Sequence, residues 1–391
     1  MISLKNLRAR KILDSRGEGT VEVLALASTG ETAVFSEPRG KSRGKHEKVS
    51  VSADTALQNI NNIITPALKG VALERQEEID KRLLELDGTE TKSELGENAI
   101  LGASLACARL ASVVNKKPLW KYLRELSGFG EPTAGPRLFI NIINGGLHAG
   151  SNLDFQEYLF IPRVTSFKEA IQSGTQVYKA LREYLEKYFG KKASLLGDEG
   201  GFAPDFKDNA EPFAIIQKVA DALQLRDKYD LGLDAAASNV RISNDKLTAI
   251  YNDLRQKYNL WYLEDPYGED DFDSFAGLLK EWNGYGLITG DDLTVTSVKR
   301  IERAAEKKSI NAVIIKPNQI GTLTETLAAM RWVRELGWKT IVSHRSGETN
   351  DDFIADLAFG VGADGFKLGA PARGERVAKY NRLLAIEEFE I

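Results

Sequence analysis

Cysteine, histidine and long apolar segments are scarce in this chain, and each scarcity excludes something. Among 391 residues there is 1 cysteine, Cys107, so a disulfide within the chain is excluded. Cys107 lies in the apolar helical pattern SLACARLAS, which favours a buried structural thiol over a catalytic nucleophile. No signal-peptide core is recognisable at the start, and no uninterrupted apolar run is long enough to span a membrane. We therefore expect a cytoplasmic protein with no membrane partner.

A large excess of charge of either sign is also missing. The formal net charge is -4, and acidic and basic residues are interspersed, which argues against a nucleic-acid partner. Hydrophobic residues make up 42% of the sequence and can fill a sizeable core. The length allows either two domains or one barrel with an additional domain.

One stretch is unusually basic, SEPRGKSRGKHEKV at residues 36–49. Gly40 and Gly44 permit backbone angles that other residues avoid, and Pro38 resists continuation of a strand, so we expect a pliable loop. A solvated charged turn is the simplest explanation of such a loop. The GKS within it resembles a phosphate-binding P-loop, but that motif requires glycine where Phe35 stands.

The first third of the chain reads as strands followed by helices. Alternating apolar and polar residues on both sides of a turn at Thr29-Gly30 predict an antiparallel hairpin. Helical patterns follow at 52–70, 74–88 and 97–115. The order predicts a separate α+β domain. Since residues 127–137 are rich in glycine and proline, we place the boundary there, with an N-terminal α+β capping domain at 1–133 and a catalytic barrel domain at 134–391.

In the second part, short apolar runs recur, and each ends in a polar residue. The intervals between successive run ends lie between 23 and 35 residues, close to the roughly 30 residues of one βα unit. This rhythm predicts a (β/α)8 barrel, whose chemistry lies at the carboxyl ends of its strands. The polar run ends are Glu199, Asp234, Glu264, Asp291, Lys316, His344 and Lys367.

Three of these run ends are carboxylates, Asp234, Glu264 and Asp291, which would repel one another unless a cation lay among them. Oxygen ligands without a Cys or His cluster suit Mg2+. Alternatively, each carboxylate could simply cap the following helix. Lys316 and Lys367 should face the same cleft, where a lysine of lowered pKa could act as a base, or where both could form ordinary salt bridges.

Other polar groups suggest acid–base chemistry on an anionic substrate. The turn SHRSGET offers His344, Arg345 and Ser346 as a donor cluster suited to phosphate. Glu199 lies on the tight turn GDEGG, and FQEYLF supplies Gln156 and Glu157. A carboxylic acid of raised pKa opposite a lysine base would form an acid–base pair on two faces of a substrate.

From about Ile12 to Glu388 the chain resembles the enolases, the phosphopyruvate hydratases, in a series of motifs that occur in order. The resemblance implies an N-terminal α+β domain packed on a variant TIM barrel that opens with two strands and two helices. The motifs are ILDSRGEGTVEV, NAILGASLACARLA, INIINGGLHAGSNLDFQEY, LGDEGGFAPDF, LGLDAAAS, LEDP, GDDLTVT, IIKPNQIGTLTET, VSHRSGETNDDFIADLA and APARGERVAKYNRLLAIEE.

The resemblance also implies roles for individual residues and two Mg2+ per active site. The implied metal ligands are Asp234, Glu264 and Asp291, with Ser42 of the basic loop reaching the second ion. Lys316 matches the family's base, Glu199 its general acid and Glu157 the supporting carboxylate. The implied substrate-binding residues are His148, Gln156, His344, Arg345, Ser346 and Lys367.

The reaction that the resemblance implies is dehydration of 2-phosphoglycerate to phosphoenolpyruvate, in an enzyme that generally forms homodimers or larger rings. The basic loop departs from the family, in which this segment reads like SGASTGEHE. Arg39, Lys41, Arg43 and Lys45 are the changes, and we expect Arg43 to contact the substrate. Two alternatives stay open: a phosphonate or more anionic substrate, as in carboxyphosphonoenolpyruvate synthases, and a non-catalytic binding protein on the same fold.

Overall fold

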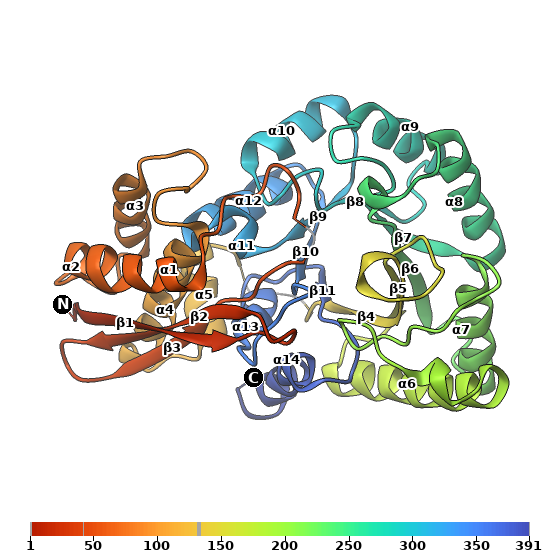
Figure 1. Cartoon of the computed structure of the whole chain (residues 1–391), viewed down its shortest axis with the longest axis horizontal. Coiled ribbons are helices and arrows are strands. Elements are labelled where there is room, and N and C mark those ends of the chain that lie inside the picture. The colour runs from red at the N-terminus through yellow and green to blue at the C-terminus, as the bar shows by residue number, and fades with distance from the viewer. Residues whose placement is uncertain (1, 42, 131–133, 391) are drawn as a thin grey trace.

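The computed structural model describes residues 2–41, 43–130 and 134–390, and it has two parts that lie side by side (Figure 1). The N-terminal part contains an antiparallel sheet in the order β1-β2-β3, with strands β1 (Leu4–Leu13), β2 (Gly19–Ala27) and β3 (Thr32–Ser36). Its helical segments are α1 (Ala53–Asn59), a π-helical turn (Ile60–Ile64), α2 (Thr65–Leu68), α3 (Gln76–Asp87), α4 (Glu97–Val114) and α5 (Leu119–Ser127).

The predicted hairpin is confirmed as β2 and β3, and the three predicted helical stretches contain α1 to α4. Alternation of apolar and polar residues explains the hairpin. Val21, Val23 and Ala25 lie on the same face of β2 and are fully buried. Strand β1 was not predicted. Its sequence LKNLRARKIL is half charged or amide-bearing, and only Leu4 and Leu7 are buried, so hydrophobic periodicity gives a weak signal.

Helix α4 is the core helix of this part. By length and composition it is apolar enough to cross a membrane, but 83% of its residues, Glu97–Val114, are buried inside the protein. It packs against β2 and β3, and Ala99, Ala103 and Ala106 are fully buried, so small side chains let the helix approach the sheet closely. Its apolar character is therefore explained by packing within the fold.

The second part is a closed barrel in the order β10-β11-β4-β5-β6-β7-β8-β9, which confirms the predicted fold class. The strands are β4 (Arg137–Asn144), β5 (Glu157–Pro162), β6 (Tyr229–Asp234), β7 (Leu260–Glu264), β8 (Leu287–Gly290), β9 (Ala312–Ile315), β10 (Lys339–Ser343) and β11 (Gly365–Lys367).

Helices surround the barrel (Figure 1). The α-helices are α6 (Phe167–Phe189), α7 (Glu211–Ala222), α8 (Asn244–Tyr258), α9 (Phe272–Trp282), α10 (Val298–Lys307), α11 (Pro317–Ile320), α12 (Leu323–Glu335), α13 (Phe353–Gly360) and α14 (Gly374–Ala385). Short 3-10 turns lie at Gly146–His148, Lys191–Ser194 and Ala237–Asn239, and a π-helical turn at Ile386–Glu390 follows α14. The opening order β4-β5-α6-α7 is the variant expected from the resemblance.

Strand β5 runs against its two neighbours, β4 and β6, whereas β6 to β11 and β4 are parallel. Because β5 is reversed, its amino end lies beside the carboxyl ends of the other strands. Glu157, its first residue, pairs in register with Asp234, the last residue of β6. The rim that carries the functional side chains therefore receives residues from both ends of strands.

The interior of the barrel is filled, so chemistry is confined to that rim. Side chains of alternate residues form a separate buried cluster inside it, and the Phe139 and Tyr262 rings lie edge to face with centroids 4.8 Å apart. The cluster also contains Leu159, Ile161, Leu287, Ala312, Ile314 and Ile341. Such layers make a solid plug below the rim rather than a channel.

The basic loop leaves β3 and crosses to the barrel rim. Arg39 exchanges two backbone hydrogen bonds with Gly347, of 2.7 and 3.0 Å, in an isolated antiparallel bridge. Gly40 follows, where a Cβ would overlap the guanidinium of Arg345, so only glycine fits. We name residues 39–48 the lid.

Candidate active site

Most of the residues singled out in the sequence line one cavity at the barrel rim. Besides the lid residue Glu47, its walls come from the ends of several strands and the turns that follow them. The predicted site residues that line it are His148, Gln156, Glu157, Glu199, Asp234, Asp291, Lys316, His344, Arg345, Ser346 and Lys367. Glu264 is fully buried just beneath them, Arg43 lies outside the cavity wall, and Ser42 lies outside the described residues.

Lys367 is the centre of a carboxylate cluster. Its Nζ lies 2.8 Å from Asp234 Oδ2, 2.9 Å from Glu264 Oε2 and 3.0 Å from Glu157 Oε1. Burial opposes the charge on the ammonium, but these carboxylates outweigh it and hold the pKa of Lys367 well above its usual value. Lys367 is thus a fixed cation.

The same cluster contains more negative charge than one lysine can balance. Burial, followed by repulsion from Asp234, raises the pKa of Glu264 to about 8. A second group, Asp265, Asp291 and Asp292, brings three carboxylate oxygens within 4.8 Å of one another. Buried oxygen donors that are short of positive charge fit a hard divalent cation such as Mg2+. The donors present therefore suit the expected metal.

Lys316 follows β9, and its Nζ is paired with Asp291 Oδ2. Burial disfavours the ammonium, yet Asp291 outweighs it, and the pKa of Lys316 is raised. This arrangement matches the alternative of a salt bridge, because the lysine shares its space with a carboxylate. Its position is held by Thr296, whose hydroxyl accepts the Lys316 N–H at 2.9 Å and whose φ of 55° is unusual for a β-branched residue.

Glu199 was predicted to lie at a strand end. It lies instead on the turn 197–201 between α6 and α7. This turn reaches the rim because Gly201 N–H donates to Asn144 Oδ1 at 3.0 Å and Phe202 bonds back to β4. Asn141 of β4 donates to Glu199 Oε2 at 2.8 Å, and His148 Nδ1 lies 3.3 Å from Glu199 Oε1. The carboxylate is thus held from two sides.

One carboxyl group of raised pKa was expected, and it is Glu157 rather than Glu199. Burial alone would raise the pKa of Glu199, but His148 and His344 outweigh burial and lower it well below the usual value. Burial and the nearby Glu199 charge instead raise the pKa of Glu157. Oxygens of both carboxyl groups and a nitrogen of His148 lie within 4.8 Å of one another, so one proton can be held within this group, here on Glu157.

His344 is fully buried and its pKa is lowered well below the ordinary value by that burial. Arg376 Nη1 lies 2.7 Å from His344 Nδ1. Because arginine can only donate, Nδ1 must accept, and the neutral ring carries its proton on Nε2. That nitrogen faces Glu199 at 3.7 Å.

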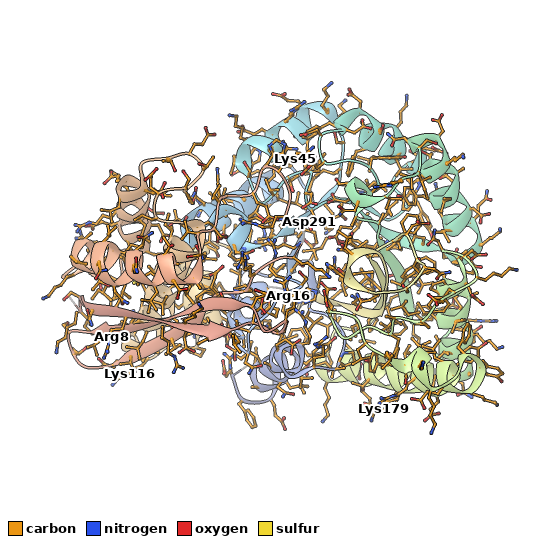
Figure 2. The ribbon with its side chains drawn as sticks, in the orientation of Figure 1. Arg8, Arg16, Lys45, Lys116, Lys179 and Asp291 are labelled. Atoms are coloured by element: carbon orange, nitrogen blue, oxygen red, sulfur yellow. The ribbon has the colours of Figure 1, made fainter. Side chains whose placement is uncertain are left out.

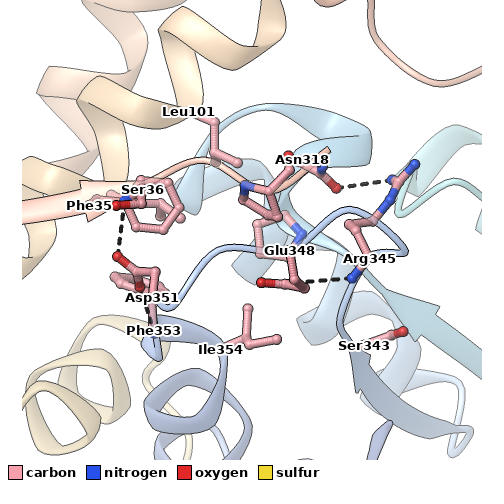
Figure 3. Close-up of a pocket in the computed structure, with 13 residues that line it drawn as sticks. Phe35, Ser36, Leu101, Asn318, Ser343, Arg345, Glu348, Asp351, Phe353 and Ile354 are labelled. Carbon is pink, nitrogen blue, oxygen red and sulfur yellow. Dashed lines mark hydrogen bonds between the residues drawn. The ribbon is translucent and has the colours of Figure 1, made fainter. Parts of the chain in front are cut away.

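Arg345 is held by both parts of the protein. Its guanidinium forms ion pairs with Glu47 at 3.1 Å and donates to Asn318 Oδ1 at 3.0 Å, and its backbone N–H donates to Glu348 Oε1 at 3.1 Å. Behind it lies a small pocket walled by Phe35 and Leu101 of the N-terminal part and by the barrel loop (Figure 3). The guanidinium is therefore fixed where the two parts meet.

The lid lies over this rim, and several of its basic residues have acidic partners. Lys45 Nζ lies 3.3 Å from Glu269 Oε1, His46 Nε2 lies 2.9 Å from Asp270 Oδ1, and Arg43 Nε lies 3.7 Å from Glu47 Oε2. Figure 2 shows Lys45 on the lid and Asp291 at the barrel mouth below it. Arg43 also donates to the Lys48 carbonyl, so it braces the lid itself rather than facing the cavity.

Sequence reasoning missed several residues that shape the site. Arg376 sets the tautomer of His344, and Asn141 orients Glu199, but neither ends a predicted run. Asp265 and Asp292 stand beside predicted ligands in LEDP and GDD, so adjacency within a motif was the available signal. The lid's acidic partners come from distant segments and left no signal.

Comparisons with known proteins agree along nearly the whole chain. Residues 4–123 match the family described as "Enolase, N-terminal domain", and residues 134–390 match "Enolase, C-terminal TIM barrel domain". The chain is 42% identical to the enolase of Methanopyrus kandleri over 99% of this chain and 96% of that protein. It is 39% identical to enolase B of Dictyostelium discoideum over 99% and 95%, and to the enolase of Methanocaldococcus jannaschii over 98% and 95%.

Proposed function

The chain belongs to the enolase family, and on that premise we propose how its rim residues dehydrate 2-phosphoglycerate to phosphoenolpyruvate. The observation that carries the proposal is the placement of Lys316 and Glu199 in one cavity, on separate segments of the rim. A base and an acid so placed can act on two ends of a small substrate. The reaction is a lyase step of glycolysis.

Arg345, Ser346 and His344 bind the phosphate in this proposal. Arg345 presents a planar fork of donors, and Ser346 supplies a hydroxyl on the same turn. Lys367 holds the substrate carboxylate, because it is a permanent cation at the centre of the rim. His148 and Gln156 complete the wall around the bound substrate.

Lys316 takes the proton from C2, and Glu199 protonates the hydroxyl that leaves C3. Lys316 must be neutral to do so, which requires its ion pair with Asp291 to be broken when the site is loaded. Glu157 and Glu199 share one proton, which Glu157 holds and can return to Glu199. Asn141 keeps Glu199 pointing into the cavity.

Asp234, Glu264 and Asp291 would hold Mg2+, with Ser42 of the lid reaching a second ion. When bound, Mg2+ offsets the negative charge that develops on the substrate as C2 loses its proton. The family uses this ion. Oxygens of Asp265, Asp291 and Asp292 lie within 4.8 Å of one another, whereas Asp234 and Glu264 are paired with Lys367, so binding by Asp234, Glu264 and Asp291 together requires these pairs to rearrange.

A more anionic substrate has less support than 2-phosphoglycerate. The lid lysines Lys41 and Lys45 have acidic partners within the chain, and His46 contacts Asp270, so these residues do not require a second anionic group on the substrate. A non-catalytic role has no support, since acid, base and metal-ligand types are all present in one cavity.

The test is an assay of the purified protein with 2-phosphoglycerate and Mg2+, read as the absorbance of phosphoenolpyruvate. Formation of product that requires added Mg2+ supports the proposal. Turnover of a phosphonate substrate without turnover of 2-phosphoglycerate would contradict it.

We also propose two domains, 1–133 and 134–391, in a cytoplasmic homodimer or larger homo-oligomer without a nucleic-acid or membrane partner. The boundary itself falls at residues 131–133, which lie outside the described residues. Ultracentrifugation of the purified protein measures the oligomeric state directly.

A further inference from the structure

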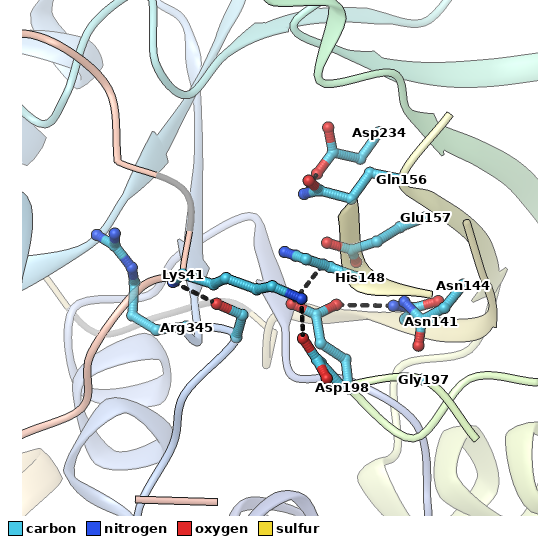
Figure 4. Close-up of polar contacts among 12 residues, drawn as sticks. Lys41, Asn141, Asn144, His148, Gln156, Glu157, Gly197, Asp198, Asp234 and Arg345 are labelled. Atoms are coloured by element: carbon cyan, nitrogen blue, oxygen red, sulfur yellow. Dashed lines mark hydrogen bonds and ion pairs between the residues drawn. The ribbon is translucent and has the colours of Figure 1, made fainter. Parts of the chain in front are cut away.

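Lys41 of the lid contacts three separate segments of the barrel rim, and Figure 4 shows its side chain reaching Asp198. Its Nζ donates to the carbonyl oxygen of Leu147 at 2.8 Å and lies 3.1 Å from Asp198 Oδ2. Its backbone N–H donates to the hydroxyl of Ser346 at 2.8 Å. One residue therefore ties the lid to three loops that are distant from one another in sequence.

Each of these contacts lies on or next to a group that the proposed reaction uses. Leu147 precedes His148, and Asp198 precedes Glu199 on the turn that carries the acid. The two turns are joined directly, because Asp198 N–H donates to the carbonyl oxygen of His148 at 3.0 Å. The carbonyl oxygen of Asp198 also accepts a hydrogen bond of 3.3 Å from Arg376, which is the partner of His344.

We propose that Lys41 is a positioning residue for the general acid: its ammonium clamps the Leu147 and Asp198 turns together and so sets Glu199 against the substrate bound at Ser346. This inference rests on the proposed function, because it assigns Glu199 the acid step. Lys41 itself does not touch the reacting atoms.

The clamp acts on the acid turn and not on the base. Lys316 is held by Asp291 and Thr296, and Gln319 in turn donates to Asp291; Lys41 shares none of these partners. Another lid lysine, Lys45, pairs with Glu269, which follows β7, whereas Asp198 lies on the turn between α6 and α7. Loss of Lys41 should therefore weaken elimination while leaving C2 proton removal intact.

The experiment compares Lys41→Met with Lys45→Met, which removes the same charge from the same lid. Two rates are measured on each holoenzyme with 2-phosphoglycerate and Mg2+: exchange of the C2 proton with D2O, and formation of phosphoenolpyruvate. The ion pair is half exposed, with side-chain exposures of 47% and 27%, so we expect a loss of about two- to fivefold in elimination. Exchange should change by less than that, and Lys45→Met should leave the ratio of the two rates unaltered.

Two further variants separate positioning from loss of structure. Lys41→Arg keeps the charge and the donors, and should restore the ratio. Asp198→Asn should reproduce the effect of Lys41→Met, and the double variant should be no worse than either alone. Equal loss of exchange and elimination in Lys41→Met, an identical effect of Lys45→Met, or no recovery in Lys41→Arg would each overturn the inference.

Failure of the proposed function gives a different result. A wild-type protein that neither exchanges the C2 proton nor forms phosphoenolpyruvate refutes the function itself. A wild type that does both, with variants that show no selective loss of elimination, refutes only the role of Lys41.

Discussion

Glu47 of the lid and Arg345 of the barrel form a bidentate ion pair, in which the terminal guanidinium nitrogens Nη1 and Nη2 both lie within 3.2 Å of a carboxylate oxygen. The side chains are only 3% and 5% exposed. The pair joins the N-terminal part to the residue proposed to bind phosphate. It accordingly serves both the stability of the fold and the geometry of the site.

Glu47→Ala should destabilise the protein substantially, because it removes a bidentate, buried ion pair with Arg345. Breaking such a pair costs about 3 kcal/mol, which for a chain of this size corresponds to a fall of roughly 3–5 °C in the thermal midpoint. Calorimetry measures this directly. Combining Glu47→Ala with Arg345→Met should recover part of the loss, and a double variant less stable than Glu47→Ala would contradict the explanation.

Lys316→Ala and Glu199→Gln should block different steps of the reaction. Lys316→Ala should abolish exchange of the C2 proton, whereas Glu199→Gln should retain exchange but lose elimination by about 10²- to 10⁴-fold. Both rates are measured by NMR and absorbance in the same samples. Matching exchange behaviour in the two variants would rule out this assignment of base and acid.

Asp291→Ala should lower Mg2+ affinity and activity together. Loss of one charged ligand contact is expected to weaken binding by about 10- to 100-fold. Titration calorimetry with Mg2+ measures the affinity. Asp270→Asn is the control, since Asp270 is an acidic rim residue that pairs with the lid. Full activity of the wild type in excess chelator would exclude the metal role altogether.

Glu97 should make the protein less stable as pH rises. Burial raises its pKa to about 8 in the folded chain, against a usual value of 4.5, although Ser50 donates to it at 2.9 Å. The folded state therefore binds more protons than the unfolded state between pH 4.5 and 8. The resulting stabilisation is complete below 4.5 and is lost as pH approaches 8.

Glu97→Gln should remove that dependence, so its thermal midpoint should exceed that of the wild type by several degrees at pH 8 and should differ little at pH 5. The charged neighbours are Glu37, Glu47, Arg43 and Arg345. Glu37 is itself buried with a raised pKa, so Glu37→Gln is the matched comparison. Identical pH profiles for wild type and Glu97→Gln would disprove the explanation.

The strand rhythm predicted where most of the site lies. Asp234, Glu264 and Lys367 end their strands, and Asp291, Lys316 and His344 follow theirs by one residue, so period and polarity were sufficient to bring them to one rim. Glu157 escaped that rule. It reaches the rim from the start of a strand, because β5 is reversed, and nothing in FQEYLF indicates direction.

The sequence did not predict electrostatic shifts that depend on contacts between distant segments. The pKa of Lys316 is raised by Asp291, and of the two carboxyl groups available as the acid, the pKa of Glu157 is raised whereas that of Glu199 is lowered by His148 and His344. The sign of a shift depends on which neighbour outweighs burial, and these neighbours come from other strands and turns. The lid likewise looked like a site for an extra anion until its partners Asp198, Glu269 and Asp270 were located.

The reversed strand has a consequence for how the chain can be rebuilt. The path turns back at β5, and the additional helix of the α6–α7 pair restores the direction, so that β6 enters the barrel parallel to β7. The two reversals of direction compensate each other. Removing either one alone would reverse the direction of every later strand and move Asp234, Lys316 and Lys367 to the opposite end of the barrel. Residues 157–222 are therefore an indivisible module, which any chimera or permutation must carry whole.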